Sequence, residues 1–189
     1  MPASPRTTTD AQPGGSDEAT SAPATVEGFV VLDHEPGEFV FARWRNVLIA
    51  VWRRTISGPH VSRFTKAVET MAAQFPGRRS NVHIVAAGTG LPSEEARLRL
   101  AASMRRYKGS LACVAVVLCG TGFWASAFRA AVSGIRLLAP GAFGFHPMES
   151  VDQVVGWLPT EHERLTGVKL DPEELRLALD AALHADATT

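Results

Sequence analysis

The stretch Phe39-Val-Phe-Ala-Arg-Trp-Arg-Asn-Val-Leu-Ile-Ala-Val-Trp52 sets the fold class of this chain. It contains two apolar runs, Phe39–Arg43 and Val47–Trp52, which are joined by Trp44-Arg45-Asn46. Short runs rich in Val, Ile, Phe and Trp are typical of β-strands, and the brief connection predicts a hairpin. Because the second run is apolar at every position, we expect a central strand that is buried on both faces.

Helix and strand patterns alternate after this hairpin. Further strands are expected at residues 82–85, 111–118 and 142–145, and one before the hairpin at 28–32. Helices are expected at residues 58–75, 92–108, 123–138 and 150–158. This order predicts an α/β fold with an N-terminal hairpin and a mostly parallel sheet covered by helices.

Three regions divide the 189 residues. Residues 1–24 are polar and lack a hydrophobic stretch, which predicts a disordered tail without a signal peptide or transit helix. Residues 25–160 hold the alternating elements and are expected to form one domain. After Pro159 the sequence becomes polar, so residues 161–189 are interpreted as a linker followed by an amphipathic helix.

That last helix, expected at residues 171–184, opens with Asp171-Pro172-Glu173-Glu174, a strong start signal. Its apolar stripe consists of Leu175, Ala178, Leu179, Ala182 and Leu183. A helix of this length is not stable alone, so the stripe must dock on this domain or on another chain. The expected surface is the flank of Ala127, Ala130 and Gly134, because small residues let two helices approach closely.

Charge is balanced, with 19 Lys and Arg against 19 Asp and Glu. A neutral chain lacks the electrostatic signature of nucleic-acid or anionic-membrane binding. The arginines at 43, 45, 53 and 54 stand near Trp44 and Trp52, but they bracket opposite ends of one strand. We therefore interpret them as solvated strand ends and expect no nucleic-acid partner.

The uncharged stretch Ser110–Phe128 is too interrupted for a membrane span. Gly120-Thr121-Gly122 breaks it in the middle, so a buried strand followed by a helix is expected, with no membrane partner. Cys113 and Cys119 lie too far apart along that strand to pair with each other. We expect both thiols to be reduced and buried, as in a cytoplasmic protein.

Gly120-Thr-Gly-Phe-Trp-Ala125 matches the pattern G-x-G-x-x-A between a strand and a helix. Phe123 and Trp124 are bulky where a phosphate should approach, and no acidic residue ends a following strand at the expected distance. A tight turn is the favoured interpretation, and no cofactor is expected, although the free amides at this helix start could hold an anion.

Two acid–histidine clusters, Asp33-His34-Glu35 and Glu161-His162-Glu163, resemble metal ligands at first sight. Neither has a second histidine at the spacing that a zinc site on a helix requires. Both are interpreted as solvated loops, and neither cysteine has the surroundings of an activated thiolate. The sequence therefore predicts no catalytic residue and no metal.

The helix expected at 123–138 has two distinct faces. Its core stripe should be formed by Trp124, Phe128, Ala131, Ile135 and Leu138. Opposite this stripe lie Ser126 and the three residues that we take as a candidate helix surface, Arg129, Ser133 and Arg136.

The order of elements and the last third of the chain resemble the STAS superfamily of anti-sigma-factor-antagonist-like domains. The resemblance rests on the strand Leu111–Leu118, the helix carrying Arg129 and Gly134-Ile135, and Phe145-His-Pro-Met-Glu-Ser-Val-Asp-Gln-Val-Val-Gly-Trp-Leu158. It covers about residues 28–158 and is mostly topological.

This resemblance implies a non-enzymatic regulatory or scaffolding domain that binds a partner protein through the start of its second helix. In that family an Asp-Ser-Ser-Gly-like signature carries a phosphorylated serine there. The matching place in this chain reads Ala87-Gly-Thr-Gly-Leu-Pro-Ser93, so the aspartate and the serine pair are missing. Thr89, Gly90 and Ser93 are the candidate partner-binding or phosphoswitch residues, although Ser93 could equally be a helix cap.

Two other functions remain open from the sequence. A small-ligand or anion sensor, or an enzyme, could use the carboxyl ends of the strands at Gly88–Gly90 and Gly120–Gly122, where open α/β sheets place ligands. Alternatively, the domain could serve to form homo-oligomers, with a second copy as its partner.

Overall fold

The computed structural model describes residues 26–139 and 144–185. The strands in these ranges are β1 (Phe29–Glu35), β2 (Phe39–Trp44), β3 (Val47–Trp52), β4 (Arg79–Val85), β5 (Leu111–Leu118) and β6 (Gly144–Met148). The helices are α1 (Gly58–Gln74), α2 (Glu94–Tyr107), α3 (Gly122–Leu138), α4 (Val151–Thr166) and α5 (Pro172–His184). The expected α/β class with its N-terminal hairpin is confirmed, whereas the tail at 1–24 lies outside the described residues.

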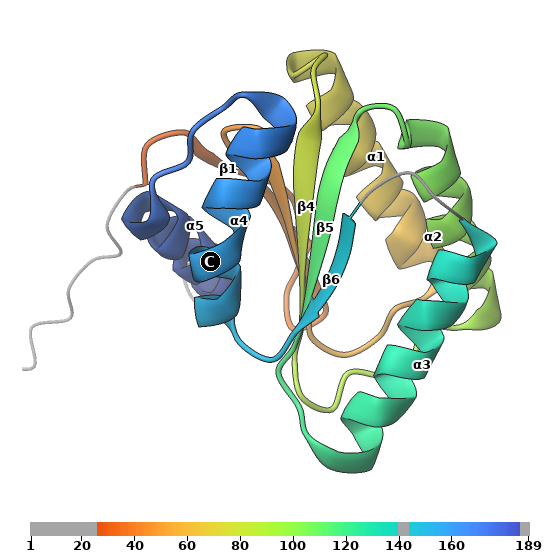
Figure 1. Cartoon of the computed structure of the whole chain (residues 1–189). Helices are drawn as coiled ribbons and strands as arrows, with labels where there is room; N and C mark the ends of the chain where they lie inside the picture. Colours follow the sequence, from red (N-terminus) through yellow and green to blue (C-terminus); the bar gives the residue numbers. More distant parts are fainter. Residues whose placement is uncertain (1–25, 140–143, 186–189) are drawn as a thin grey trace, which may run out of the picture.

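The six strands form one mixed sheet whose spatial order equals their order along the chain. β1, β2 and β3 are antiparallel neighbours, and β3 to β6 are parallel. Right-handed crossovers between strands that are added in one direction leave every crossover helix on the same face. Accordingly, α1, α2 and α3 cover one face of the sheet, and α4 and α5 cover the other (Figure 1).

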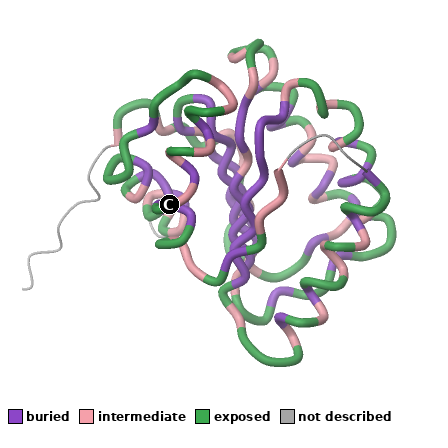
Figure 2. Tube along the Cα trace, in the orientation of Figure 1, coloured by how far each residue is buried: buried purple, intermediate pink, exposed green. Residues whose placement is uncertain are grey.

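The sheet separates two apolar cores, because successive strand residues point to opposite faces. On β3, Leu48, Ala50 and Trp52 pack in the core beneath α1 to α3. Val47, Ile49 and Val51 pack in the core beneath α4 and α5. Every residue of β3 is buried, which confirms the expected central strand, and the buried residues follow the strands in Figure 2.

Three strand boundaries differ from the expectation. β4 begins at Arg79 instead of residue 82, because Arg79 and Ser80 are polar but buried with hydrogen-bond partners. β1 continues to Glu35, past the expected turn start at His34, where Arg63 of α1 binds its acidic side chains. β6 spans Gly144–Met148 instead of 142–145, and residues 142–143 lie outside the described ranges.

α4 does not end near residue 158, so the expected linker from residue 161 is wrong. The helix continues through Pro159 to Thr166 and ends at Gly167, whose left-handed φ of 74° closes it. Leu158 and His162 lie on its buried stripe. Packing of that stripe outweighs the hydrogen bond and steric cost of an internal proline.

α5 docks within the chain, but not on the flank of Ala127, Ala130 and Gly134. Its stripe packs against α4, β2 and β3, on the face of the sheet opposite α3. Arg45 pairs with Glu174 in the first turn of α5 at 2.7 Å, and Arg53 donates to the Leu183 carbonyl near its end at 2.9 Å. Both arginines therefore bind α5. Arg45 is still exposed, as expected of a solvated strand end, whereas Arg53 is partly buried.

Among the described residues, no helix combines the length and apolar character needed to cross a bilayer.

Candidate functional site

The candidate residues Thr89, Gly90 and Ser93 lie in the loop between β4 and α2. We call this loop and the start of α3 the loop edge, meaning residues 88–93 and 120–124. The Trp124 indole N–H donates to the Thr89 carbonyl at 2.8 Å, and the Gly90 amide donates to the Arg54 carbonyl at 2.7 Å. These bonds join the loops that follow β3, β4 and β5 into one surface.

Thr89 is a structural residue of this edge. Its side chain is 1% exposed, and its hydroxyl lies within 3.2 Å of the carbonyl oxygens of Trp52, Arg53 and Ala86. A kinase cannot reach a hydroxyl buried in this way. Among the two hydroxyl candidates, only Ser93 is exposed.

Ser93 caps α2, since its Oγ accepts a hydrogen bond from the Ala96 amide at 3.1 Å. Glu94 and Glu95 occupy the first turn beside it. A phosphate on Ser93 would gain from the helix dipole, while Glu94 and Glu95 directly after it carry charge of the same sign.

Two large apolar side chains project from the loop edge into solvent. Phe123 is 90% exposed and Leu91 is 52% exposed. Phe123 directly precedes Trp124 and Leu91 follows Thr89 by two positions, so both lie close in sequence to the residues of the Thr89–Trp124 hydrogen bond. Exposed apolar residues with a rigid base are typical of surfaces that bind other proteins.

The G-x-G-x-x-A stretch does not form an open phosphate cradle. The Trp124 ring lies against Gly120 so closely that a Cβ on that glycine would overlap it. Gly122 has a left-handed φ of 66° and begins α3. Trp124 thus fills the space that the backbone would need for approach to a diphosphate.

Arg129, Ser133 and Arg136 lie together on α3, as their spacing predicts. They line a surface groove of about 190 Å³ between α3 and the strands β5 and β6. The apolar part of the groove is formed by Val116, Leu118, Val132, Phe145 and Pro147. Arg129 pairs with Glu149 at 3.3 Å, while Arg136 has no side-chain partner in the described ranges.

The expected flank of Ala127, Ala130 and Gly134 does not hold α5, and α2 packs against α3 instead. Ala130 is exposed, and a Cβ on Gly134 would meet no atom within 4 Å, so these small residues do not mark a close helix contact. The expected core stripe is buried at Phe128 and Ile135, whereas Leu138 at its end is 44% exposed.

Sequence reasoning missed a buried polar chain beneath α4. Ser80 Oγ lies 2.7 Å from His162 Nδ1, and His162 Nε2 lies 3.0 Å from Asn46 Oδ1. Cys113 Sγ is 3.1 Å from Ser80 Oγ, and the Asn46 amide donates to the Arg78 carbonyl at 3.2 Å. His162 is fully buried, so its interpretation as a solvated loop residue is corrected.

The buried polar network includes a serine hydroxyl next to a histidine ring, the atoms of a nucleophile–base pair, but a substrate would need access to both. Ser80 and His162 are both 0% exposed. Burial lowers the pKa of His162 to about 4 and raises the pKa of the Cys113 thiol to about 11, so both groups are neutral. The arrangement ties α4 to β4, and only Cys119 of the two free cysteines is exposed, against the expectation that both are buried.

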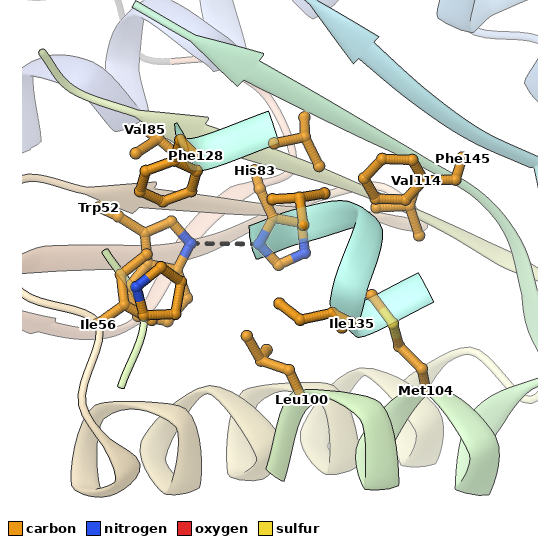
Figure 3. A pocket seen from close by; sticks show the side chains of 13 residues that line it. Trp52, Ile56, His83, Val85, Leu100, Met104, Val114, Phe128, Ile135 and Phe145 are labelled. Atoms are coloured by element: carbon orange, nitrogen blue, oxygen red, sulfur yellow. Dashed lines mark hydrogen bonds between the residues drawn. The ribbon is translucent and has the colours of Figure 1, made fainter. Parts of the chain in front are cut away.

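A second buried histidine, His83 on β4, lies on the other face of the sheet. It borders a small apolar cavity between the sheet, α2 and α3, with Trp52, Leu100 and Ile135 around it (Figure 3). The Trp52 indole N–H donates to His83 Nδ1 at 3.2 Å. The alternation of the strand Val82-His-Ile-Val85 could have indicated that His83 faces a core.

No group of three His, Cys, Asp or Glu side chains within residues 26–139 and 144–185 is placed to hold a metal ion. No protein-family model matches the sequence, and no curated protein matches it either.

Proposed function

We propose that this chain is a non-enzymatic, STAS-like regulatory or scaffolding domain that binds a partner protein through its loop edge. The exposure of Phe123 and Leu91 on this edge carries the proposal. Burying two such side chains against a partner contributes about 1.5–3 kcal/mol each. The STAS resemblance points to the same place, the start of α2.

The construction of the edge supports this role. Trp124, the residue after Phe123, donates to the Thr89 carbonyl, while the Thr89 hydroxyl is itself bonded to carbonyls at the ends of β3 and β4. A partner therefore meets a surface that is already ordered, so binding loses little conformational entropy.

A non-catalytic role is supported by the position of the reactive groups. Ser80, His162 and Cys113 are buried beneath α4. Ser93, which is exposed two positions after Leu91, is the position at which a modification would reach the partner surface.

The test is a capture experiment with matched surface variants. The full chain is immobilised and exposed to lysate of its native cells, beside Phe123→Ser, Leu91→Ser and the control Leu177→Ser. Leu177 is 46% exposed on α5, on the other face of the sheet. We expect one protein to be retained by the wild-type chain and by Leu177→Ser but lost with both loop-edge variants.

Mass spectrometry identifies the captured protein, and light scattering of the purified chain shows whether it is a second copy. Equal capture by Phe123→Ser and wild type would remove the loop edge as the binding surface.

A further inference from the structure

A polar groove of about 360 Å³ lies on the surface between α1 and α2, which are neighbours on one face of the sheet (Figure 1). Three basic side chains and one carboxylate line it, so the groove is cationic although the chain as a whole is neutral. A hollow lined by charge of one sign attracts ligands of the opposite sign more strongly than a flat surface does.

The two walls of the groove are in register. Both helices run in the same direction, since each connects two parallel strands. At one end the Arg99 guanidinium donates to Ser62 Oγ at 2.7 Å, across 37 positions of sequence. Further along, Arg106 pairs with Glu69 at 3.5 Å with the same separation. A residue on the α1 wall therefore faces the residue 37 positions later on α2.

This register leaves one cation in the middle of the groove without a carboxylate. Both arginines have acidic partners, Glu69 and Glu95. Lys66 instead faces Ser103, and both line the groove. Within the described ranges, the exposed Lys66 ammonium forms no ion pair and the Ser103 hydroxyl forms no hydrogen bond. The centre of the groove thus offers an ammonium and a hydroxyl to an anionic ligand.

The spacing of the cations indicates the length of that anion. Arg99 and Arg106 lie on either side of Lys66, seven residues apart on α2, which corresponds to about 10 Å of helix. Their side chains are 50% and 68% exposed, so both guanidinium groups have room to turn toward the centre. A linear anion with two charged groups meets Lys66 and one arginine at each end, whereas a single small anion does not. Arginine and lysine are both ordinary phosphate-binding residues.

We propose that the α1–α2 groove binds a small molecule through a diphosphate group. Lys66 and the Ser103 hydroxyl bind the middle of the diphosphate, and Arg99 and Arg106 bind its two ends. This site lies apart from the loop edge and does not depend on partner binding there.

Small anions test the length of the ligand. The full chain is titrated by calorimetry with inorganic diphosphate, inorganic phosphate and sulfate, in the absence of divalent cations. We expect diphosphate to bind one to one and about tenfold more tightly than the two smaller anions, because only diphosphate reaches both arginines. Isopentenyl diphosphate distinguishes the source of the group: tighter binding than inorganic diphosphate indicates an organic diphosphate, and weaker binding indicates the free anion.

Surface variants assign the site. Lys66→Gln should weaken diphosphate binding about tenfold. Lys169→Gln makes the same change of charge at an exposed position between α4 and α5 and should have no effect. Glu69→Gln should strengthen binding about threefold, because it removes a repulsive carboxylate and frees Arg106. All three side chains are exposed, so the variants keep the fold.

The opposite signs expected for Lys66→Gln and Glu69→Gln separate a built site from general attraction of anions. Equal affinity for diphosphate and sulfate, or equal losses in Lys66→Gln and Lys169→Gln, would overturn the proposal. Weaker binding by Glu69→Gln, or absence of saturable diphosphate binding to the wild-type chain, would also overturn it.

Discussion

At the scale of single residues, two buried histidines have lower pKa values in the folded chain than in the unfolded chain. His83 and His162 lie on opposite faces of the sheet, and burial lowers the pKa of each to about 4 from an ordinary value of 6.5. The unfolded chain therefore binds more protons than the folded one between these values. The contribution of the two neutral rings to stability is therefore fully present above pH 6.5 and is lost as the pH falls toward 4.

We expect the free energy of unfolding to fall by roughly 3 kcal/mol per histidine across this window. Urea unfolding at a series of pH values measures it. His162→Gln should make the dependence shallower, because glutamine does not titrate yet can bond Ser80 and Asn46. His34→Asn, at an exposed position, serves as the control. A stability that stays constant from pH 6.5 to 4 would contradict the assignment of both rings as buried neutral groups.

The polar residues of the core could not be predicted from the sequence. Ser80, Asn46 and His162 are up to 116 positions apart, and each looks like a surface residue in its own segment. Their burial follows from mutual hydrogen bonds, which exist only once β3, β4 and α4 are assembled. By contrast, Arg129, Ser133 and Arg136 share one helix, so helical spacing alone places them together.

At the scale of elements, α4 shows why a proline did not indicate the end of a helix. Pro159 normally stops a helix, yet Leu158 before it and His162 after it are both buried on one stripe. Gly167, with its left-handed backbone, marks the true end and was available as a sequence signal. A contact with the sheet outweighs a local preference of about 3 kcal/mol.

The helix should become more stable when this proline is removed. Pro159→Ala restores an N–H to the Val155 carbonyl and relieves the ring contact, so we expect stabilisation of about 1–3 kcal/mol by urea unfolding. The control is Pro172→Ala at the first position of α5, where proline is favourable and its removal should not stabilise. A lower stability of Pro159→Ala would show that α4 requires its proline.

At the scale of the whole molecule, the one-directional strand order dictates where α5 must lie. Three crossover helices share one face, so the other face of β2 and β3 stays bare unless a later segment covers it. The sequence allowed the order of elements and the apolar stripe of α5 to be predicted. Helix spacing alone does not indicate the docking site of α5, because the bare face of the sheet follows from the handedness of the crossovers.

Because the two cores share the same strands, loss of a buried side chain from one core should destabilise both cores. Leu179→Ala, at a fully buried position of α5, should lower stability by about 2–5 kcal/mol, whereas Leu177→Ala should cost little. Trp44 reports on the α4–α5 face and Trp52 on the α1–α3 face. Single-tryptophan variants should show both probes shifting together, and a shift of Trp44 alone would indicate two independent cores.

The pairing of α5 with β2 and β3 also has a consequence for biosynthesis. Arg45 and its partner Glu174 are 129 residues apart, so the early strands leave the ribosome well before the helix that covers them. At about 5–20 residues per second, the apolar face of the hairpin waits roughly 10 s for its cover. During that interval the nascent chain exposes Val40, Ala42 and Ile49, which form an apolar surface of the kind that chaperones bind. Slow codons between residues 52 and 171 would lengthen this exposure without altering the finished protein.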